Sequence, residues 1–185
     1  MAHSSDAQPP ALSAGPLRLE FHRSADRYAH SLKCVNDGVP CELMASIEGQ
    51  GTERFPPSPP LQQLHFEEHG GKQVAMLVGM AEGNHWSAAI SAENESLEFD
   101  IACHTSARLV AHEYSSLGST YHAIPTAKLK KTDNGILLQL AAARVLVQTS
   151  QFTEVDLTRG TLCLRPLAGS PHPTSTLRWR YLINS

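Results

Sequence analysis

The region between residues 61 and 104 constrains the fold most, because it divides into four runs separated by short turn segments. Each run is about eight residues long, which is an ordinary length for a β-strand. The runs are LQQLHFEE, QVAMLVGM, HWSAAISA and LEFDIACH, and the segments between them are HGGK, AEGN and ENES. Strands joined in sequence by such short Gly-, Asn- and Ser-containing turns are typical of an antiparallel β-meander.

Alternation of apolar and polar residues predicts how the last two runs pair. If the ENES turn joins Ala92 to Leu97, the opposed pairs on one face are Trp86 with Cys103, Ala88 with Ile101, and Ile90 with Phe99. A shift of one residue would move every side chain to the other face, so this pairing defines a core side. Extending it outward predicts a further core row on the two preceding runs, made of Val74, Met76, Val78, Met80, Leu64 and Phe66.

The opposite face of the predicted meander has small residues in its middle and polar residues at its edges. It contains His65, Glu67, Ala75, Leu77, Gly79, His85, Ser87, Ala89, Ser91, Glu98, Asp100, Ala102 and His104. A solvated sheet face usually carries more Lys, Arg, Glu and Thr, so we expect this face to be covered or to line a cavity. The predicted ligand-binding residues on its rim are His85, Ser87, Asp100 and His104.

The rest of the chain supports the same fold class. Roughly nine or ten strands with short turns predict an all-β protein, either an antiparallel β-barrel or a two-sheet β-sandwich. We expect at most one or two short helices, at residues 24–31 and 106–114. Residues 1–16 are rich in Ala, Ser and Pro and predict a disordered tail, which leaves residues 17–185 as a single all-β domain.

Charge and apolar patterning exclude several classes of partner. The formal net charge is −3 and the charges of both signs are interspersed, so we expect neither nucleic acid nor a membrane as partner. The longest apolar segment, ILLQLAAARVLV, is too short and too polar to cross a bilayer. Residues 1–16 contain no basic stretch followed by an apolar run, so the expected location is the cytoplasm.

Two groups of histidines raise the question of a metal site or a catalytic site. HFEEH, at residues 65–69, spells the H-x-x-E-H pattern of inverted zincins, which must lie on a helix. On a strand His65 and His69 stand about 14 Å apart, and only a helix starting after Ser58 would bring them together. His85 and His104 are opposed with β-carbons about 5 Å apart. Asp100 lies about 14 Å from His104 along the strand, so we expect no metal site, no catalytic dyad and no cofactor.

The cysteines raise the question of a disulfide. Cys34 and Cys41 flank VNDGVP, and a two-residue turn at Asp37 and Gly38 would place them directly opposite each other. That arrangement permits a disulfide, whereas a reducing cytoplasm favours buried free thiols. The sequence favours free thiols and leaves the disulfide as the alternative.

Three hypotheses about function follow. The first is a soluble, non-enzymatic module that binds a small or extended ligand, or a protein partner, on the small-residue face. The second is a hydrolase or isomerase that uses a histidine as general acid or base. The third is a structural domain that self-associates, for example as a homodimer, through an open strand edge.

Overall fold

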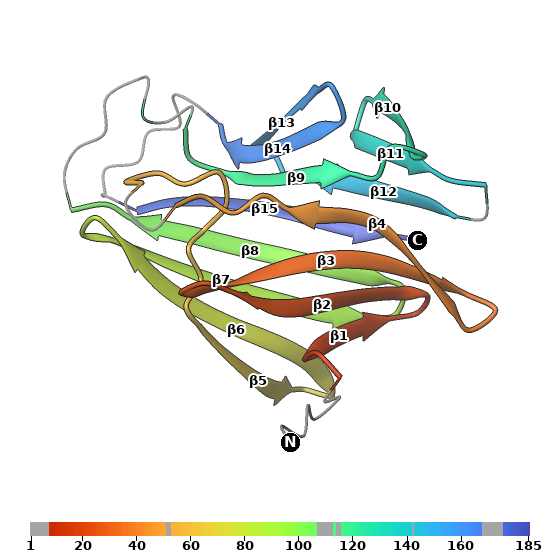
Figure 1. Cartoon of the computed structure of the whole chain (residues 1–185), viewed down its shortest axis with the longest axis horizontal. Helices are drawn as coiled ribbons and strands as arrows, with labels where there is room; N and C mark the ends of the chain where they lie inside the picture. The colour runs from red at the N-terminus through yellow and green to blue at the C-terminus, as the bar shows by residue number, and fades with distance from the viewer. Residues whose placement is uncertain (1–7, 51–52, 107–112, 114–115, 142, 168–175) are drawn as a thin grey trace, which may run out of the picture.

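The computed structural model describes residues 8–50, 53–106, 113, 116–141, 143–167 and 176–185, and folds them into fifteen strands in two antiparallel sheets (Figure 1). Sheet A contains, in spatial order, β1 (Ala11–Ala14), β2 (Leu17–Ser24), β3 (Arg27–Asn36), β4 (Val39–Ser46), β9 (Ser119–Ala123), β14 (Thr161–Pro166) and β13 (Thr153–Thr158). Sheet B contains β10 (Lys128–Thr132), β11 (Gly135–Gln139), β12 (Arg144–Thr149), β15 (Thr176–Asn184), β8 (Ser96–His104), β7 (Asn84–Glu93), β6 (Lys72–Ala81) and β5 (Gln63–His69).

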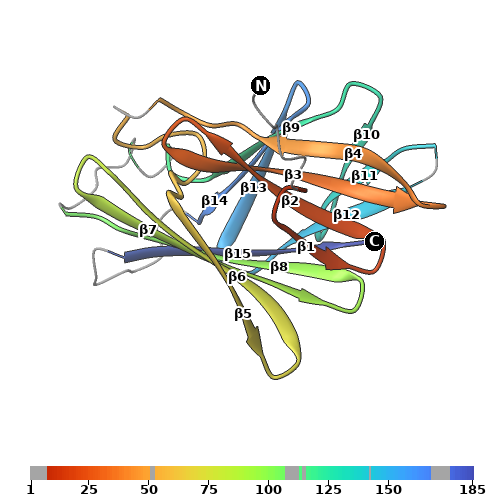
Figure 2. The ribbon, with the colours of Figure 1, turned by 60° about the horizontal axis from the view of Figure 1, so that its bottom comes forward.

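The two sheets make a sandwich, which confirms the all-β prediction and decides against the barrel. Figure 2 shows β2, β3 and β4 in one layer and β7, β8 and β15 in the layer facing it. The apolar faces of both sheets are buried against each other, as sheets with one apolar face require. The meander of the sequence forms β5 to β8 as four consecutive neighbours in sheet B.

Two predictions about local structure are wrong. The helix expected at residues 24–31 is absent, because Arg27–Asn36 forms β3, an interior strand of sheet A between β2 and β4. The disordered tail expected over residues 1–16 is wrong for Ala11–Ala14, which pairs with β2 and buries Leu12 opposite Leu19, while residues 1–7 lie outside the described residues. The second expected helix, at residues 106–114, lies mostly outside the described residues.

The register predicted for the last two meander strands is confirmed. Trp86 lies opposite Cys103 and Ile90 opposite Phe99. β15 then pairs with β8 and places Tyr181 beside Phe99, where the two rings stack with centroids 4.6 Å apart. Alternate residues along these strands are buried, so Trp, Ile, Phe and Tyr side chains fill the space between the sheets.

The predicted core row is wrong for β6. The inner row consists of Ala75, Leu77 and Gly79, whereas Met76 and Met80 point outward and are 40% and 55% exposed. Val74 and Val78 alternate with the inner row and belong to the outward row as well. Leu64 and Phe66 on β5 pack against the core as predicted.

The reason for this register is a close approach beneath Gly79. A β-carbon at Gly79 would lie 1.8 Å from the carbonyl oxygen of Pro60, so no larger residue fits there without a shift. The segment around Pro60 connects both sheets, because the amide of Tyr28 donates to the carbonyl of Leu61 and the amide of Gln62 donates to the carbonyl of Val78. Gly79 therefore belongs to the inner row, and its neighbours on β6 face outward.

Replacing Gly79 tests this contact. We expect Gly79→Ala to lower the free energy of unfolding by about 1–3 kcal/mol, because one added carbon overpacks the space that Pro60 occupies. Ala89→Ser, which adds one atom on the outer face of β7, is the matched control and should change stability by less than about 0.5 kcal/mol. Equal stability of Gly79→Ala and the wild type in urea unfolding would contradict the contact.

Candidate functional site

The outer face of sheet B has an open depression of about 500 Å³ at the end where β6 and β8 finish and β7 and β15 begin. One wall is the outward row of β6, where Val78 and Met80 expose their side chains. The floor is formed by Ser87 on β7 and its cross-strand partner Ala102 on β8. Because both floor side chains are small, a bound group can approach the strands closely.

The far end of the depression is polar. His85 lies opposite His104, and His104 in turn lies opposite Thr176 at the start of β15. His104 Nδ1 and Thr176 Oγ1 are 2.9 Å apart and form a hydrogen bond. Gln62 closes the side next to β6, where its Oε1 accepts from the amide of Met80 at 3.1 Å. Hydrogen-bonding groups therefore converge at one end of a mostly apolar surface.

The structure brings three of the four predicted ligand-binding residues to this depression. His85, Ser87 and His104 line it, whereas Asp100 lies one row further along β8. Asp100 accepts hydrogen bonds from the guanidinium groups of Arg178 and Arg180, the latter at 2.6 Å. Burial raises the pKa of Asp100, but the bonds from the two arginines lower it more, so the pKa lies below its usual value. Asp100 is therefore engaged in an ion-pair cluster beside the depression.

The small-residue face expected from the sequence exists only in part. Ser87, Ala89, Ser91 and Ala102 occupy the outer face as predicted. Ala75, Leu77 and Gly79 were assigned to the same face and instead belong to the core, because β6 has the opposite register. The outer face consequently combines a small-residue floor with an apolar ridge on β6.

Sequence reasoning missed Thr176 and the apolar wall. Thr176 reaches His104 only because β15 joins sheet B beside β8, and local patterns do not reveal pairing across 72 positions. The wall was detectable from the Glu82-Gly83 pair, which is a turn sequence. In the structure both residues have positive φ and form a two-residue turn that aligns Ala81 with Asn84. Counting outward from that turn places Met80 opposite His85.

Neither group of histidines considered in the sequence has, in the part of the chain that the structure describes, the ligands that a metal site needs. Within the described ranges, no group of three or more His, Cys, Asp or Glu side chains is close enough to hold a metal ion. His65 and His69 lie on strand β5 rather than on the helix that the inverted-zincin pattern requires. Among the same residues, no helix has the length and apolar character needed to cross a membrane.

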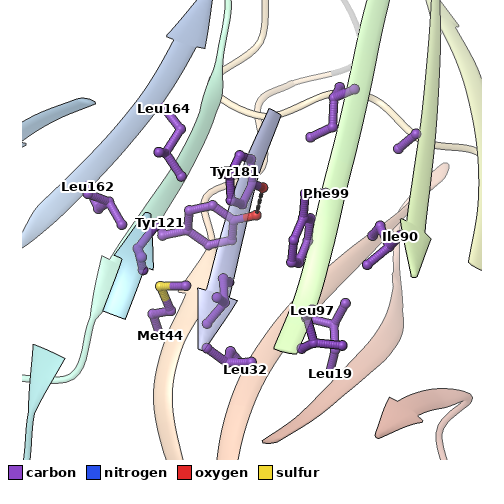
Figure 3. Close-up of a cluster of buried hydrophobic side chains, with 14 of the residues drawn as sticks. Leu19, Leu32, Met44, Ile90, Leu97, Phe99, Tyr121, Leu162, Leu164 and Tyr181 are labelled. Atoms are coloured by element: carbon purple, nitrogen blue, oxygen red, sulfur yellow. Dashed lines mark hydrogen bonds between the residues drawn. The ribbon is translucent and has the colours of Figure 1, made fainter. Parts of the chain in front are cut away.

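A second polar group, unforeseen from the sequence, lies inside the sandwich. His30 Nε2 and the Tyr121 hydroxyl are 2.8 Å apart, and the Tyr121 and Tyr181 hydroxyls are 2.5 Å apart. Figure 3 shows the two tyrosine hydroxyls facing each other between the sheets. His30 and Tyr121 belong to sheet A and Tyr181 to sheet B, so this chain of hydrogen bonds joins the layers.

His30 is held in the neutral form by its surroundings. Its ring lies 6.2 Å from Phe21 and 6.1 Å from Phe99, measured between centroids. Burial, with a smaller contribution from His22, lowers the pKa of His30 to about 4. The residue is 6% exposed, which suits a structural hydrogen bond better than proton transfer to a ligand.

Comparison with known proteins assigns no relative, since the chain matches no family model and no curated protein or solved structure resembles it. What the protein does must therefore be inferred from its own residues. The depression offers shape, apolar surface and a few hydrogen-bonding groups, which are the ingredients of a binding site.

The pKa of His30 predicts a pH-dependent stability. Because the folded pKa of about 4 is below the unfolded value of 6.5, the unfolded state takes up a proton first as the pH falls. Stability is therefore complete above pH 6.5 and declines toward pH 4, by about 3 kcal/mol from this residue. Urea unfolding of the wild type and His30→Gln at several pH values should show a shallower decline in the variant. Identical slopes in the two proteins would contradict the assignment.

Proposed function

We propose that the protein is a binding module that holds a small amphipathic molecule in the depression on sheet B and performs no chemistry on it. The observation that carries the proposal is the depression itself. Its volume of about 500 Å³ falls within the range of about 300–1,000 Å³ that is usual for small-molecule sites. Its apolar wall is open to solvent, and its hydrogen-bonding groups gather at one end.

The lining indicates how such a ligand would lie. Its apolar body would cover Val78 and Met80, and the small side chains of Ser87 and Ala102 would let it rest on the strands. A hydrogen-bonding group at its other end would reach the polar end around His85. Methionine side chains are flexible and polarisable, so Met80 can adjust to the shape of the ligand.

The distribution of exposed apolar residues supports a binding role for this face. Met76, Val78 and Met80 are all more than a third exposed and follow one another on the same side of β6. Scattered exposed apolar residues are normal, whereas a contiguous group marks a surface that meets a ligand or partner. The group leads directly into the depression, whose lining includes Val78 and Met80.

The charges beside the depression favour an uncharged ligand. Arg178 and Arg180 are balanced by Asp100, which bonds both, and by Glu98, which is close enough to act on Arg178. Hydrogen bonding to Asp100 is the largest cause of the raised pKa of Arg178, and the charge of Glu98 adds to it. Two positive and two negative groups leave no excess charge to attract an ion.

Methyl resonances of methionine offer a direct test. A set of uncharged amphipathic compounds is titrated into protein labelled with ¹³C at the methionine methyl groups. We expect at least one compound to shift the Met80 signal, and Met76 less, because Met80 lines the depression and Met76 lies further along the same outward row of β6. Met44 is buried in the core and serves as the internal control.

Variants then locate the site. Met80→Ser should weaken binding of the compound about tenfold, because it removes the apolar contact of one side chain. Leu182→Ser, which removes another exposed apolar residue of sheet B, is the matched control and should leave affinity unchanged. The proposal is wrong if no compound shifts Met80, or if Met80→Ser binds as well as the wild type. A Met80 shift that depends on protein concentration alone would instead identify a second copy as the partner.

A further inference from the structure

The tip of the β3–β4 hairpin holds two cysteines opposite each other. Cys34 and Cys41 are cross-strand partners, and both are free thiols. Cys34 is 3% exposed, whereas Cys41 is exposed, so the expectation that both thiols are buried is wrong for Cys41. The cause lies in the neighbouring strand, because β9 pairs with β4 only from Met44 onward and leaves the tip of β4 uncovered.

The register at the tip places the two thiols within reach of each other. Asp37 and Gly38 have positive φ and form the two-residue turn that the sequence predicted. Val35 and Pro40 are cross-strand partners on β3 and β4. The amide of Val35 donates to the carbonyl of Pro16 on the other side of β3, and Pro40 has no amide hydrogen, so Val35 and Pro40 form a pair without hydrogen bonds to each other. Cys34 and Cys41 therefore form the adjacent hydrogen-bonded pair, with α-carbons about 5.5 Å apart. Disulfides span about 4.4–6.8 Å.

We propose that Cys34 and Cys41 are a site of reversible oxidation, at which a small disulfide such as oxidised glutathione converts the two thiols into a cross-strand disulfide. The Cys41 thiolate attacks one sulfur of the reagent, forms a mixed disulfide and expels one thiolate. The Cys34 thiolate then attacks the Cys41 sulfur and expels the second thiolate. The two protons from the cysteines pass to the released thiolates, so two electrons leave the protein and one oxidised glutathione becomes two reduced ones.

Exposure sets the order of these steps. Cys41 is open to solvent and meets the reagent, while Cys34 is shielded from it. Burial, and in second place the nearby Cys41, raises the pKa of Cys34, so Cys34 is the weaker first nucleophile. Of the other cysteines, Cys103 is buried with a pKa raised to about 12 by that burial. Cys163 is partly buried and accepts a hydrogen bond from the Thr120 hydroxyl.

The strand geometry makes the bond easy to reverse. Opposed β-carbons in an antiparallel pair are about 4.5–5.5 Å apart, whereas a disulfide requires about 3.5–4.5 Å. Oxidation must therefore draw the two strands together, and a strained disulfide is more readily reduced than a relaxed one. The affected segment is the projecting hairpin tip in Figure 1, where Val39 is 67% exposed. Oxidation would cross-link the two strands at this tip, and reduction would remove the cross-link.

Intact-mass spectrometry of the native full-length chain tests the proposal. With excess oxidised glutathione we expect the wild type to lose two hydrogens, about 2 Da, without a lasting adduct, and reduced glutathione to restore the starting mass. A peptide map should link Cys34 to Cys41. Cys34→Ser should keep one glutathionyl group on Cys41, and Cys41→Ser should gain an adduct about tenfold more slowly or not at all. Cys163→Ser is the control and should behave as the wild type.

Three results would overturn the proposal. They are a glutathionyl group that persists on Cys41 of the wild type, a covalent dimer through Cys41, and oxidation of Cys34 only after denaturation. Alkylation with iodoacetamide gives a second measurement that needs no variant. Cys41 should react first in the native wild type, and the alkylated protein should then fail to form the disulfide.

Discussion

The carbonyl of Pro60 beneath Gly79 is the contact on which the outer surface of sheet B depends. It occupies the space of a side chain, so any residue larger than glycine at that inner position of β6 requires a shift of the backbone. Side chains alternate along a strand, and this one position therefore turns Met76, Val78 and Met80 to solvent. The segment that carries Pro60 is hydrogen-bonded to β3 of sheet A and to β6 of sheet B, so the segment that shapes the wall of the depression also links the two sheets.

The interior holds the two layers in one arrangement by apolar packing and by a few directed bonds. Trp86 and Trp179 meet edge to face with centroids 6.2 Å apart. Trp179 also donates its indole hydrogen to the Ser119 hydroxyl on the opposite sheet. Together with the bonds from His30 through Tyr121 to Tyr181, this bond pairs the polar atoms of Trp179 and of the two buried tyrosines, whereas the indole nitrogen of Trp86 is buried with no hydrogen-bond partner among the described residues. Apolar burial supplies most of the stability, and the hydrogen bonds specify how the sheets face each other.

The sequence predicts the fold class and the β7–β8 register because Trp86, Ile90 and Phe99 alternate with small or polar residues. It does not predict the register of β6 in the same way, because the two sides of this strand are both apolar: one side carries valine and methionine, and the other carries alanine and leucine. Both rows are apolar, and only the Glu-Gly turn and the glycine itself distinguish them. Asp100 and His104 were found as rim residues, but their partners come from β15, which is remote in sequence. No local pattern contains that information.

The orientation of β6 can be measured directly by oxidation of methionine in the native protein. Hydrogen peroxide converts accessible methionine to its sulfoxide, and peptide mapping by mass spectrometry follows each site. We expect Met76 and Met80 to oxidise early while buried Met44 remains unmodified until the protein unfolds. Protection of Met76 and Met80 equal to that of Met44 would mean that this row faces the core. In that case the wall of the depression, and the binding site inferred from it, would not exist.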